Sequence, residues 1–493
     1  MKNTIIRGTI VLTIAGVITR LIGFYYRIFL SNAIGAEGMG LYQLVFPVAG
    51  LGFAICVSGI QTAIAKFVAA NKNSSKTLIA GTTLSLLLSV LFTFAIFFNS
   101  HFVAERILLN AECEMLIKIL VLSIPLSCVH SCINGYYIGL EKTRVPAFSQ
   151  LFEQIIRVAS VYVLIYLYHS AGKGVTPLVA MYGLVFGEIA SVIYCLLSLV
   201  FAKHFHFLCT GLRNEFKKIV GFSVPLTANR ILMALLQSGE AILIPAQLRV
   251  FGMSNSEALS IYGVLTGMAL PIILFPSTLI NSASTMILPS VSKAQSTGAE
   301  DTISKTISSS LEYCITLGIF CTGMFVFYGA RAGSIIFHND SVAHFIFILA
   351  WLCPFLYIAT TMGSILNGLG KTTATSTQNT IGILIRILFI IFLTKYYGIN
   401  AYLWSLLISQ VYVSGMHLFS IRRMYKISFH FTDYICKPVF SIAISIGISL
   451  ILFRQLAVYN LFSEIVQILI GAGIATALFF LFQILYRKDP KRA

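Results

Sequence analysis

Long apolar stretches alternate with short polar segments along the whole chain, and each stretch is long enough to cross a lipid bilayer as a helix. About 20 residues in a helix cross the ~30 Å hydrocarbon core of a membrane. The seventh and eighth stretches are longer than a bilayer requires, so we expect those helices to tilt, bend or extend beyond it. The pattern predicts fourteen transmembrane helices, which span residues 8–33, 41–69, 77–100, 115–139, 147–169, 176–202, 216–250, 258–292, 303–330, 342–369, 374–397, 400–425, 433–453 and 460–487.

The composition excludes most other protein classes. Of 493 residues, 57% are hydrophobic and only 10% are charged, whereas a soluble domain carries about 25% charged residues. A soluble enzyme, a secreted disulfide scaffold and a disordered chain are therefore excluded. The fold class is all-α polytopic membrane protein. Arg20 interrupts the first apolar run and no small-residue cleavage site follows, so we expect an uncleaved first helix rather than a signal peptide.

The basic residues predict the orientation. The net charge of +17 would suggest a nucleic-acid partner in a soluble protein, but here most of the excess lies in short loops, so we expect the bilayer as partner and no nucleic acid. With the N-terminus inside, Lys and Arg number 22 in the inner segments and 6 in the outer ones. Cytoplasmic loops carry this excess in membrane proteins. The counts predict that the N- and C-termini are both cytoplasmic.

The chain also contains an internal repeat. Residues 139–158 align without a gap on 368–387 at an offset of 229, and Arg157 matches Arg386. Earlier in each half, Arg20 matches Arg230 at an offset of 210. Six helices separate the copies, which makes them parallel repeats, as in transporters built from two lobes. We therefore expect an N-lobe over 1–210 (helices 1–6), a C-lobe over 211–428 (helices 7–12), and helices 13–14 with a basic tail over 429–493.

Arginines inside the apolar helices are the first candidate site. A charge at a helix centre costs about 2.5–3.5 kcal/mol on insertion scales, so it usually faces a cavity or a partner. Arg20 and Arg27 are seven residues apart and share a helix face. The repeat gives Arg230 and Gln237 the equivalent positions. Arginine binds phosphate oxygens with two parallel hydrogen bonds, so this pattern predicts an anion site; interfacial or purely structural arginines are the alternative.

Acidic residues supply a second set of candidates. Glu153 and Arg157 stand at i and i+4, the favourable order for an intrahelical ion pair. The two residues could simply neutralise each other, or Arg157 could bind substrate, and the pattern fits both equally well. Arg386, the repeat partner of Arg157, is a candidate for the same substrate contact. Glu240 has no opposite charge three or four residues away, which makes it a candidate for coupling or gating, with Glu153; a protonated, silent Glu240 is the alternative.

Several kinds of chemistry lack a signal. Gly370-Lys371-Thr372 ends like a phosphate-binding loop, but it follows a membrane helix and the required preceding glycine is Ile365. Neither the ten cysteines nor His204 and His206 have metal-ligand spacing. We expect no cofactor, no metal and no catalytic residues, so the protein is not expected to be an enzyme. A monovalent cation or a proton stays open as coupling ion.

Three sequence stretches carry a family resemblance: 19-TRLIGFYYRIFLSNAIGAEGMGLYQLVFPV-48, 287-ILPSVSKA-294, and the Gly-Leu-x-Lys-Thr turns of both halves. With fourteen helices, the chain resembles the multidrug/oligosaccharidyl-lipid/polysaccharide exporter superfamily. Within it, the chain is most similar to the stage V sporulation protein B branch, which is similar to the lipid II flippases. Arg20 and Arg27 flank Gly23-Phe24 as an arginine pair does in those flippases.

The resemblance implies two six-helix lobes around a V-shaped central cavity and alternating access. It implies a flippase in the bacterial plasma membrane that exports an undecaprenyl-diphosphate-linked saccharide, with peptidoglycan precursor for the spore cortex as favoured cargo and cell-wall synthesis enzymes as further partners. Three alternatives stay open. They are a cation-coupled drug antiporter of the same superfamily, a non-transporting scaffold for cortex synthesis, and a membrane-embedded transferase.

Overall fold

The computed structural model describes residues 2–70, 75–202, 212–427, 429–458 and 463–487. Within these ranges the chain consists of helices joined by short turns, and no strand is present. The all-α fold class expected from the sequence is therefore confirmed. The basic tail expected at the C-terminus, residues 488–493, lies outside the described residues.

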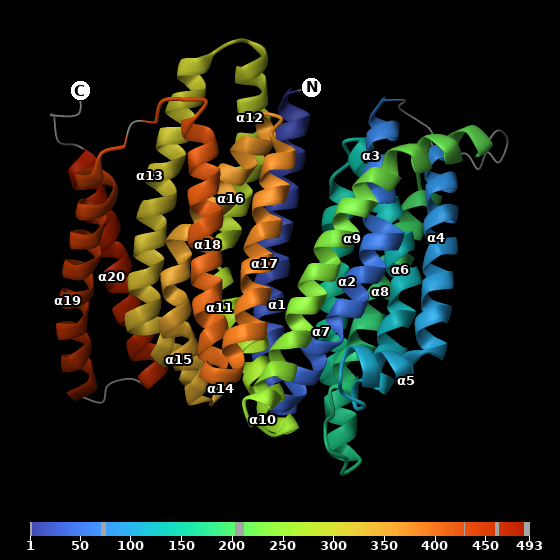
Figure 1. Cartoon of the computed structure of the whole chain (residues 1–493), viewed down its shortest axis with the longest axis horizontal. Helices are drawn as coiled ribbons and strands as arrows, with labels where there is room; N and C mark the ends of the chain where they lie inside the picture. The colour runs from blue at the N-terminus through green and yellow to red at the C-terminus, as the bar shows by residue number, and fades with distance from the viewer. Residues whose placement is uncertain (1, 71–74, 203–211, 428, 459–462, 488–493) are drawn as a thin grey trace. The chain divides into compact units, whose positions relative to one another are not determined.

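The helices form two compact units, Met1–Gly263 and Val264–Ala493. The first unit contains α1 (Lys2–Leu44), α2 (Phe46–Phe53), α3 (Gly59–Ala70), α4 (Ser75–Phe98), α5 (Ser100–Phe102), α6 (Cys113–Gly139), α7 (Arg144–Ser170), α8 (Leu178–Val200), α9 (Leu212–Val250) and α10 (Asn255–Gly263). The second contains α11 (Leu270–Leu274), α12 (Ser277–Ser296), α13 (Glu300–Met324), α14 (Ala330–Phe337), α15 (Asp340–Leu349), α16 (Cys353–Gly368), α17 (Thr372–Tyr397), α18 (Ile399–Arg422), α19 (Lys437–Val458) and α20 (Glu464–Arg487). Figure 1 labels these helices.

The units and the expected lobes rest on different criteria. The units reflect the density of internal packing, which places α9 and α10 with the first unit because α9 packs on α2, α3 and α4. The lobes reflect the sequence repeat, which starts its second copy at residue 211. The lobe boundaries therefore stay a prediction.

Among the described residues, twelve helical segments are long and apolar enough to cross a membrane. The first, Ile14–Ala70, has 57 residues, which exceeds the length of a single crossing. Gly35 interrupts α1 inside this segment with φ 71°, a left-handed conformation that glycine adopts without a steric penalty. The chain is thus a multi-pass membrane protein, and the count of fourteen helices stays a prediction.

Side chains on α4 are arranged as expected for a helix in lipid. Leu87, Leu91 and Phe94 are exposed, while Ser85 and Ser89 are completely buried. Ser85 Oγ donates to the Cys56 carbonyl oxygen across the helix contact. In water the pattern would be reversed, whereas in lipid small polar side chains join helices and large apolar ones face the solvent.

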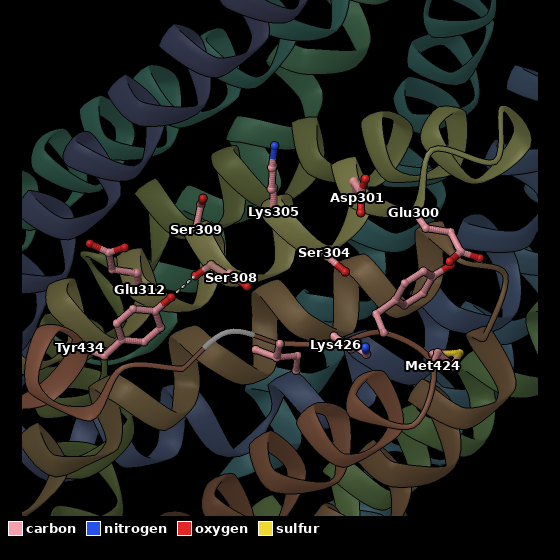
Figure 2. Close-up of a pocket in the computed structure, with 12 residues that line it drawn as sticks. Glu300, Asp301, Ser304, Lys305, Ser308, Ser309, Glu312, Met424, Lys426 and Tyr434 are labelled. Carbon is pink, nitrogen blue, oxygen red and sulfur yellow. Dashed lines mark hydrogen bonds between the residues drawn. The ribbon is translucent and has the colours of Figure 1, made fainter. Parts of the chain in front are cut away.

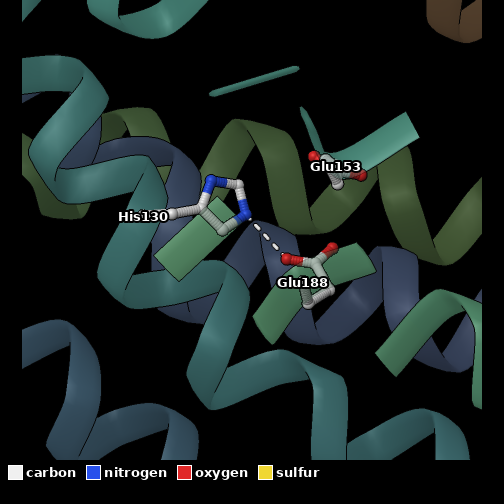
Figure 3. Close-up of side chains that lie close together, drawn as sticks. All are labelled: His130, Glu153 and Glu188. Atoms are coloured by element: carbon white, nitrogen blue, oxygen red, sulfur yellow. Dashed lines mark hydrogen bonds and ion pairs between the residues drawn. The ribbon is translucent and has the colours of Figure 1, made fainter. Parts of the chain in front are cut away.

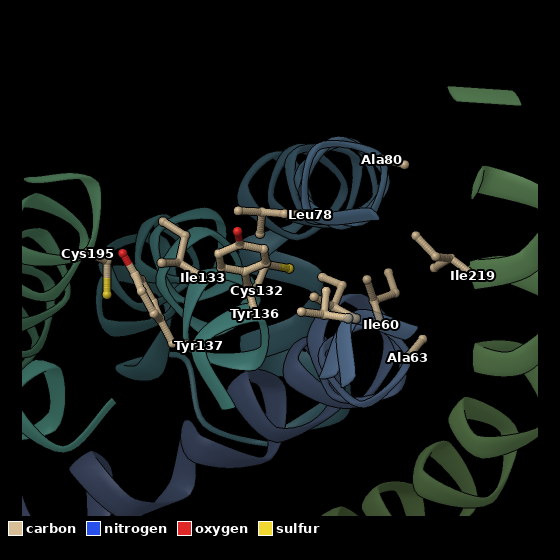
Figure 4. Close-up of a cluster of buried hydrophobic side chains, with 12 residues drawn as sticks. Ile60, Ala63, Leu78, Ala80, Cys132, Ile133, Tyr136, Tyr137, Cys195 and Ile219 are labelled. Atoms are coloured by element: carbon tan, nitrogen blue, oxygen red, sulfur yellow. The ribbon is translucent and has the colours of Figure 1, made fainter. Parts of the chain in front are cut away.

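A buried apolar cluster joins the helices of the first unit (Figure 4). It is formed by side chains from α3, α4, α6, α8 and α9, which are Ile60, Ala63, Ile64, Val68, Leu78, Ala80, Cys132, Ile133, Tyr136, Tyr137, Cys195 and Ile219. Tyr137 keeps its hydroxyl satisfied by donating to the Ser198 carbonyl oxygen at 2.8 Å. This cluster holds α6 and α8 in place, and those two helices carry part of the polar site described below.

Local structure recurs in the second unit at an offset of the sequence repeat. Ser149 hydrogen-bonds to Ser191, and 229 residues later Gln378 donates to Ser420. A hydrogen bond between the same two positions of each copy supports an ancestral unit that was duplicated.

Candidate functional site

A group of polar side chains lies among α6, α7 and α8 of the first unit. His130 Nε2 on α6 is 2.7 Å from Glu188 Oε2 on α8, so the ring N–H donates to the carboxylate. Both side chains are about nine-tenths buried, with 11% and 10% exposed. Figure 3 shows this contact and the carboxylate of Glu153 beside it. One ligand atom from each of these three residues lies within 4.8 Å of the others.

Glu153 also forms the ion pair that its spacing predicts. Its Oε1 accepts a hydrogen bond from Arg157 Nη2, one helical turn further along α7. The prediction of an intrahelical pair is therefore confirmed. With His130 neutral, two carboxylates and one guanidinium leave this group of four residues with one net negative charge; one proton on His130 makes the sum zero.

Two glycines on α8 bring this helix close to α7. A Cβ atom at Gly187 would lie 2.8 Å from the Glu153 carbonyl oxygen, and one at Gly183 would lie 2.2 Å from Val161 Cγ2. Glycines four residues apart are a recurrent way for membrane helices to approach closely. The approach puts Glu188, one residue after Gly187, opposite the Glu153–Arg157 pair.

A second layer of polar contacts lies beside the charged group. Asn134 Nδ2 donates to Ser149 Oγ at 3.4 Å, and Ser149 and Ser191 share a hydrogen bond of 2.7 Å. The Cys195 thiol is 3.3 Å from Ser149 Oγ. These contacts join the same three helices, α6, α7 and α8. They fix how each helix is rotated about its axis, and this rotation turns the charged side chains toward one another.

A cavity of about 310 Å³ adjoins the charged group. Arg157 and Glu188 line it together with Leu184, four residues of α2 and four of α6. Pockets for small ligands have volumes of about 300–1,000 Å³, so the cavity is large enough to hold one.

The arginines of α1 have different surroundings. Arg20 is exposed, whereas Arg27 is partly buried within electrostatic range of Tyr26 and Tyr42. The same two tyrosines lie within electrostatic range of Arg157. The fold therefore brings Arg27 and Arg157, which the sequence predicted as binding residues, into one neighbourhood of the first unit.

The candidates on α9 are divided between two environments. Arg230 Nη2 donates to Thr62 Oγ1 on α3 at 3.3 Å. Gln237 is exposed. Glu240 is buried and lies within electrostatic range of Tyr262 on α10. These three residues do not join the group around His130, and their binding or coupling roles stay predictions.

Arg386, the repeat partner of Arg157, lies on α17 of the second unit and is partly buried. Near it along the chain, Gln378 accepts a hydrogen bond from His417 Nδ1 at 2.6 Å and donates to Ser420. His417 stands 229 residues after Glu188. Glu188 and His417 thus stand at the same repeat position, and each has a polar partner, although the partners His130 and Gln378 do not correspond in the repeat.

Sequence reasoning did not consider His130, and it counted Glu188 among the charges inside apolar helices without assigning it a role. A neutral histidine in an apolar stretch does not register in a count of charges, and 58 residues separate it from its partner. The one available signal was Glu188 itself, a carboxylate inside an apolar helix that needs a partner. That signal indicates a partner without telling which residue it is.

The second unit has a larger pocket, of about 900 Å³, between α13 and the connection from α18 to α19 (Figure 2). Glu300, Asp301 and Glu312 line it, with Lys305 and Lys426. The Tyr434 hydroxyl donates to the Ser308 carbonyl oxygen at 3.3 Å across it. None of the residues assigned a binding or coupling role from the sequence lines this pocket, so it is a separate feature.

Comparison with known proteins gives consistent results. The sequence model described as polysaccharide biosynthesis protein matches residues 5–295. Stage V sporulation protein B of Bacillus subtilis (strain 168) is 25% identical over 447 residues, which cover 88% of this chain and 86% of the relative.

Solved structures match over most of the chain. The lipid II flippase MurJ in an inward closed conformation has a TM-score of 0.73 at 14% identity, covering 97% of this chain and 99% of that one. An inward-facing multidrug resistance transporter of the MATE family has a TM-score of 0.66 at 12% identity, covering 82% and 94%. At these identities the structural matches show a shared fold, that of flippases and transporters rather than enzymes.

Proposed function

Because the chain belongs to the polysaccharide biosynthesis protein family, we propose that it is a flippase that moves a lipid-linked saccharide from the inner to the outer leaflet by alternating access. The observation that carries this proposal is the set of arginines inside apolar helices, Arg20 and Arg27 on α1 and Arg157 on α7. Such charges are costly in a membrane and usually serve a transport pathway. The likeness to stage V sporulation protein B along most of both chains supports it.

The cargo we propose is an undecaprenyl-diphosphate-linked saccharide, with peptidoglycan precursor for the spore cortex as the favoured example. Arginines would replace the hydration of the diphosphate, since a guanidinium stays charged and binds phosphate oxygens in pairs. Arg20, Arg27, Arg230 and Arg386, with Gln237, are the residues proposed for this contact, and Arg157 is proposed to bind the saccharide part of the same substrate. The lipid tail stays in the bilayer throughout.

The driving force follows from the charge of that cargo. Moving an anion out of a negative interior gains about 2.3 kcal/mol per charge per 100 mV, so the membrane potential suffices to drive export. We propose Glu240 and Glu153 as residues that gate or couple the cycle, with a proton or a monovalent cation as the ion. The orientation with both termini cytoplasmic in a bacterial plasma membrane belongs to this proposal, as do cell-wall synthesis enzymes as partners.

A vesicle assay tests the proposal. The purified chain is reconstituted with a fluorescent lipid-linked disaccharide, and a membrane-impermeant glycosidase is added outside. A flippase exposes the inner-leaflet fraction, so cleavage should pass the roughly half that empty vesicles allow and approach completion. Vesicles with a heat-inactivated chain are the control.

The assay also separates the alternatives. If the chain is folded and cleavage of the disaccharide still stops at the level of empty vesicles, the flippase proposal is contradicted and a scaffold is favoured. Proton-dependent uptake of a cationic dye by the same vesicles would instead favour the drug antiporter.

A further inference from the structure

The cavity of about 310 Å³ in the first unit is lined by both apolar and polar side chains. Phe46, Ala49, Gly50 and Phe53 form one face of α2 at intervals of three and four residues. Leu120, Ser123, Ile124 and Ser127 form the facing side on α6 with the same spacing. Arg157 and Glu188 complete the lining. The cavity thus combines two phenylalanine rings with two hydroxyls, a carboxylate and a guanidinium.

Several polar groups in this lining have hydrogen-bonding capacity that the described residues do not use. Arg157 donates through Nη2 to Glu153, and its buried Nε has no acceptor among the described residues. Glu188 accepts through Oε2 from His130, and Oε1 has no donor. Ser127 lines the cavity, and its Oγ forms no hydrogen bond with another described residue. The lining therefore offers an unused donor, an unused acceptor and a free hydroxyl beside one another.

The charges limit which ligand fits. An anion would meet the carboxylates of Glu188 and Glu153, and a cation would meet the Arg157 guanidinium. A neutral hydroxyl avoids both conflicts, because it accepts from a guanidinium and donates to a carboxylate at the same time. A ring that carries several hydroxyls also has a C–H face, which packs on an aromatic side chain.

We propose that this cavity is a subsite for one neutral sugar ring of the transported saccharide. The proposal rests on the proposed function, which supplies the saccharide, and it adds a binding site separate from the arginines assigned to the diphosphate on α1 and α9. Arg157 and Glu188 hold the sugar hydroxyls, Ser127 adds a third polar contact, and Phe46 and Phe53 contact the ring face.

Gly50 allows a test that leaves the polar residues intact. A Cβ atom at Gly50 meets no atom within 4 Å, and the residue lines the cavity. A leucine there adds side-chain volume to the lining of the cavity. Gly221 on α9 is a matched control, since it is also helical, exposed and without neighbours within 4 Å of a Cβ atom, and it is absent from this lining.

The experiment measures binding to the full chain in lipid nanodiscs, because alkyl-glycoside detergents carry the ligand chemistry under test. The probes are methyl glucoside with methyl N-acetylglucosaminide as neutral sugars, inorganic pyrophosphate as anion and tetraphenylphosphonium as cation. Saturation-transfer NMR should detect the sugars with the wild type and with Gly221→Leu, and detect none with Gly50→Leu. Ser127→Ala should weaken sugar binding about threefold to tenfold, the loss of one hydrogen bond.

Two results with the Gly50→Leu variant would overturn the subsite. One is sugar binding that Gly50→Leu leaves unchanged. The other is a site of different chemistry, in which the wild type binds pyrophosphate or tetraphenylphosphonium but no sugar, and Gly50→Leu abolishes that binding. The vesicle assay keeps this proposal distinct from the flippase proposal. Transport by the wild type without sugar binding refutes the subsite alone, whereas sugar binding lost in Gly50→Leu without any transport refutes the flippase alone.

Discussion

His130 and Glu188 depend on each other because each is polar and sits deep among apolar helices. The contact joins α6 to α8 through two side chains that are about nine-tenths buried. Removing one partner of a buried pair leaves the other without compensation, which costs about 3–5 kcal/mol, whereas removing both together costs less. Substitutions in this pair therefore test whether the contact between α6 and α8 stabilises the first unit.

We expect His130→Ala and Glu188→Gln each to lower the melting temperature of the purified chain. The double variant should lose less than the sum of the two single losses. A thiol-reactive dye measures this directly, since eight of the nine cysteines in the described ranges are buried and all nine are free. Glu112→Gln is the control, because Glu112 is exposed. Additive losses in the double variant would contradict a direct pair.

Arg20 offers a different kind of test, because it is exposed on α1. Its replacement removes a charge without opening a buried contact, so we expect Arg20→Ala to abolish export with near-normal abundance in the membrane. Arg20→Lys should keep part of the activity, since an ammonium keeps the charge and loses the paired hydrogen bonds. Full export by Arg20→Ala would remove Arg20 from the proposed site.

At the scale of elements, close helix packing in the first unit depends on two glycines. A Cβ atom at Gly40 of α1 would lie 2.1 Å from the Leu259 carbonyl oxygen, and one at Gly263 of α10 would lie 2.1 Å from the Ala36 carbonyl oxygen. Backbone atoms cannot move aside as a flexible side chain does. Only glycine at both positions allows α1 and α10 to pack at this distance.

We therefore expect Gly40→Ala or Gly263→Ala to destabilise the chain by about 1–3 kcal/mol, the usual cost of overpacking. Gly239→Ala on α9 is the matched control, because a Cβ atom there meets no atom within 4 Å and alanine favours a helix. Thermal melting in nanodiscs compares the three. A melting temperature for Gly263→Ala at or above that of Gly239→Ala would show that α1 and α10 pack differently.

At the scale of the whole molecule, the distribution of basic residues predicts topology. Single-cysteine labelling with a membrane-impermeant reagent should find Lys142, Lys217 and Lys371 inside, and Lys173 and Lys395 outside, when each is replaced in turn. The parallel repeat requires Lys142 and Lys371 on the same side. Labelling of position 371 from outside would refute the parallel-repeat arrangement.

The driving force is a property of the whole molecule as well. If the cargo is an anion, an inside-negative potential should increase outward transport, and Glu240→Gln should keep part of it. Vesicles with an imposed potassium diffusion potential compare the wild type with Glu240→Gln. Complete loss of transport in Glu240→Gln, together with inhibition by an inside-negative potential, would exclude the anionic lipid as cargo and favour cation exchange.

The sequence by itself determined what depends on neighbours along the chain. The membrane class follows from apolar stretches of bilayer length, and the Glu153–Arg157 pair follows from a spacing of four residues, since a helix puts such residues side by side wherever it lies. The duplicated unit was visible in the Arg157 and Arg386 segments for the same reason, because a repeat is a property of the linear order.

Only the tertiary structure decided which distant residues meet. The contact of His130 with Glu188, the approach of Gly40 to α10 and the cavity beside Arg157 all depend on how each helix is rotated about its own axis. In a soluble protein the polar face of a helix indicates that rotation. Here lipid surrounds helices that are apolar on nearly every side, so the pattern along the chain leaves the rotation open, and packing between helices sets it.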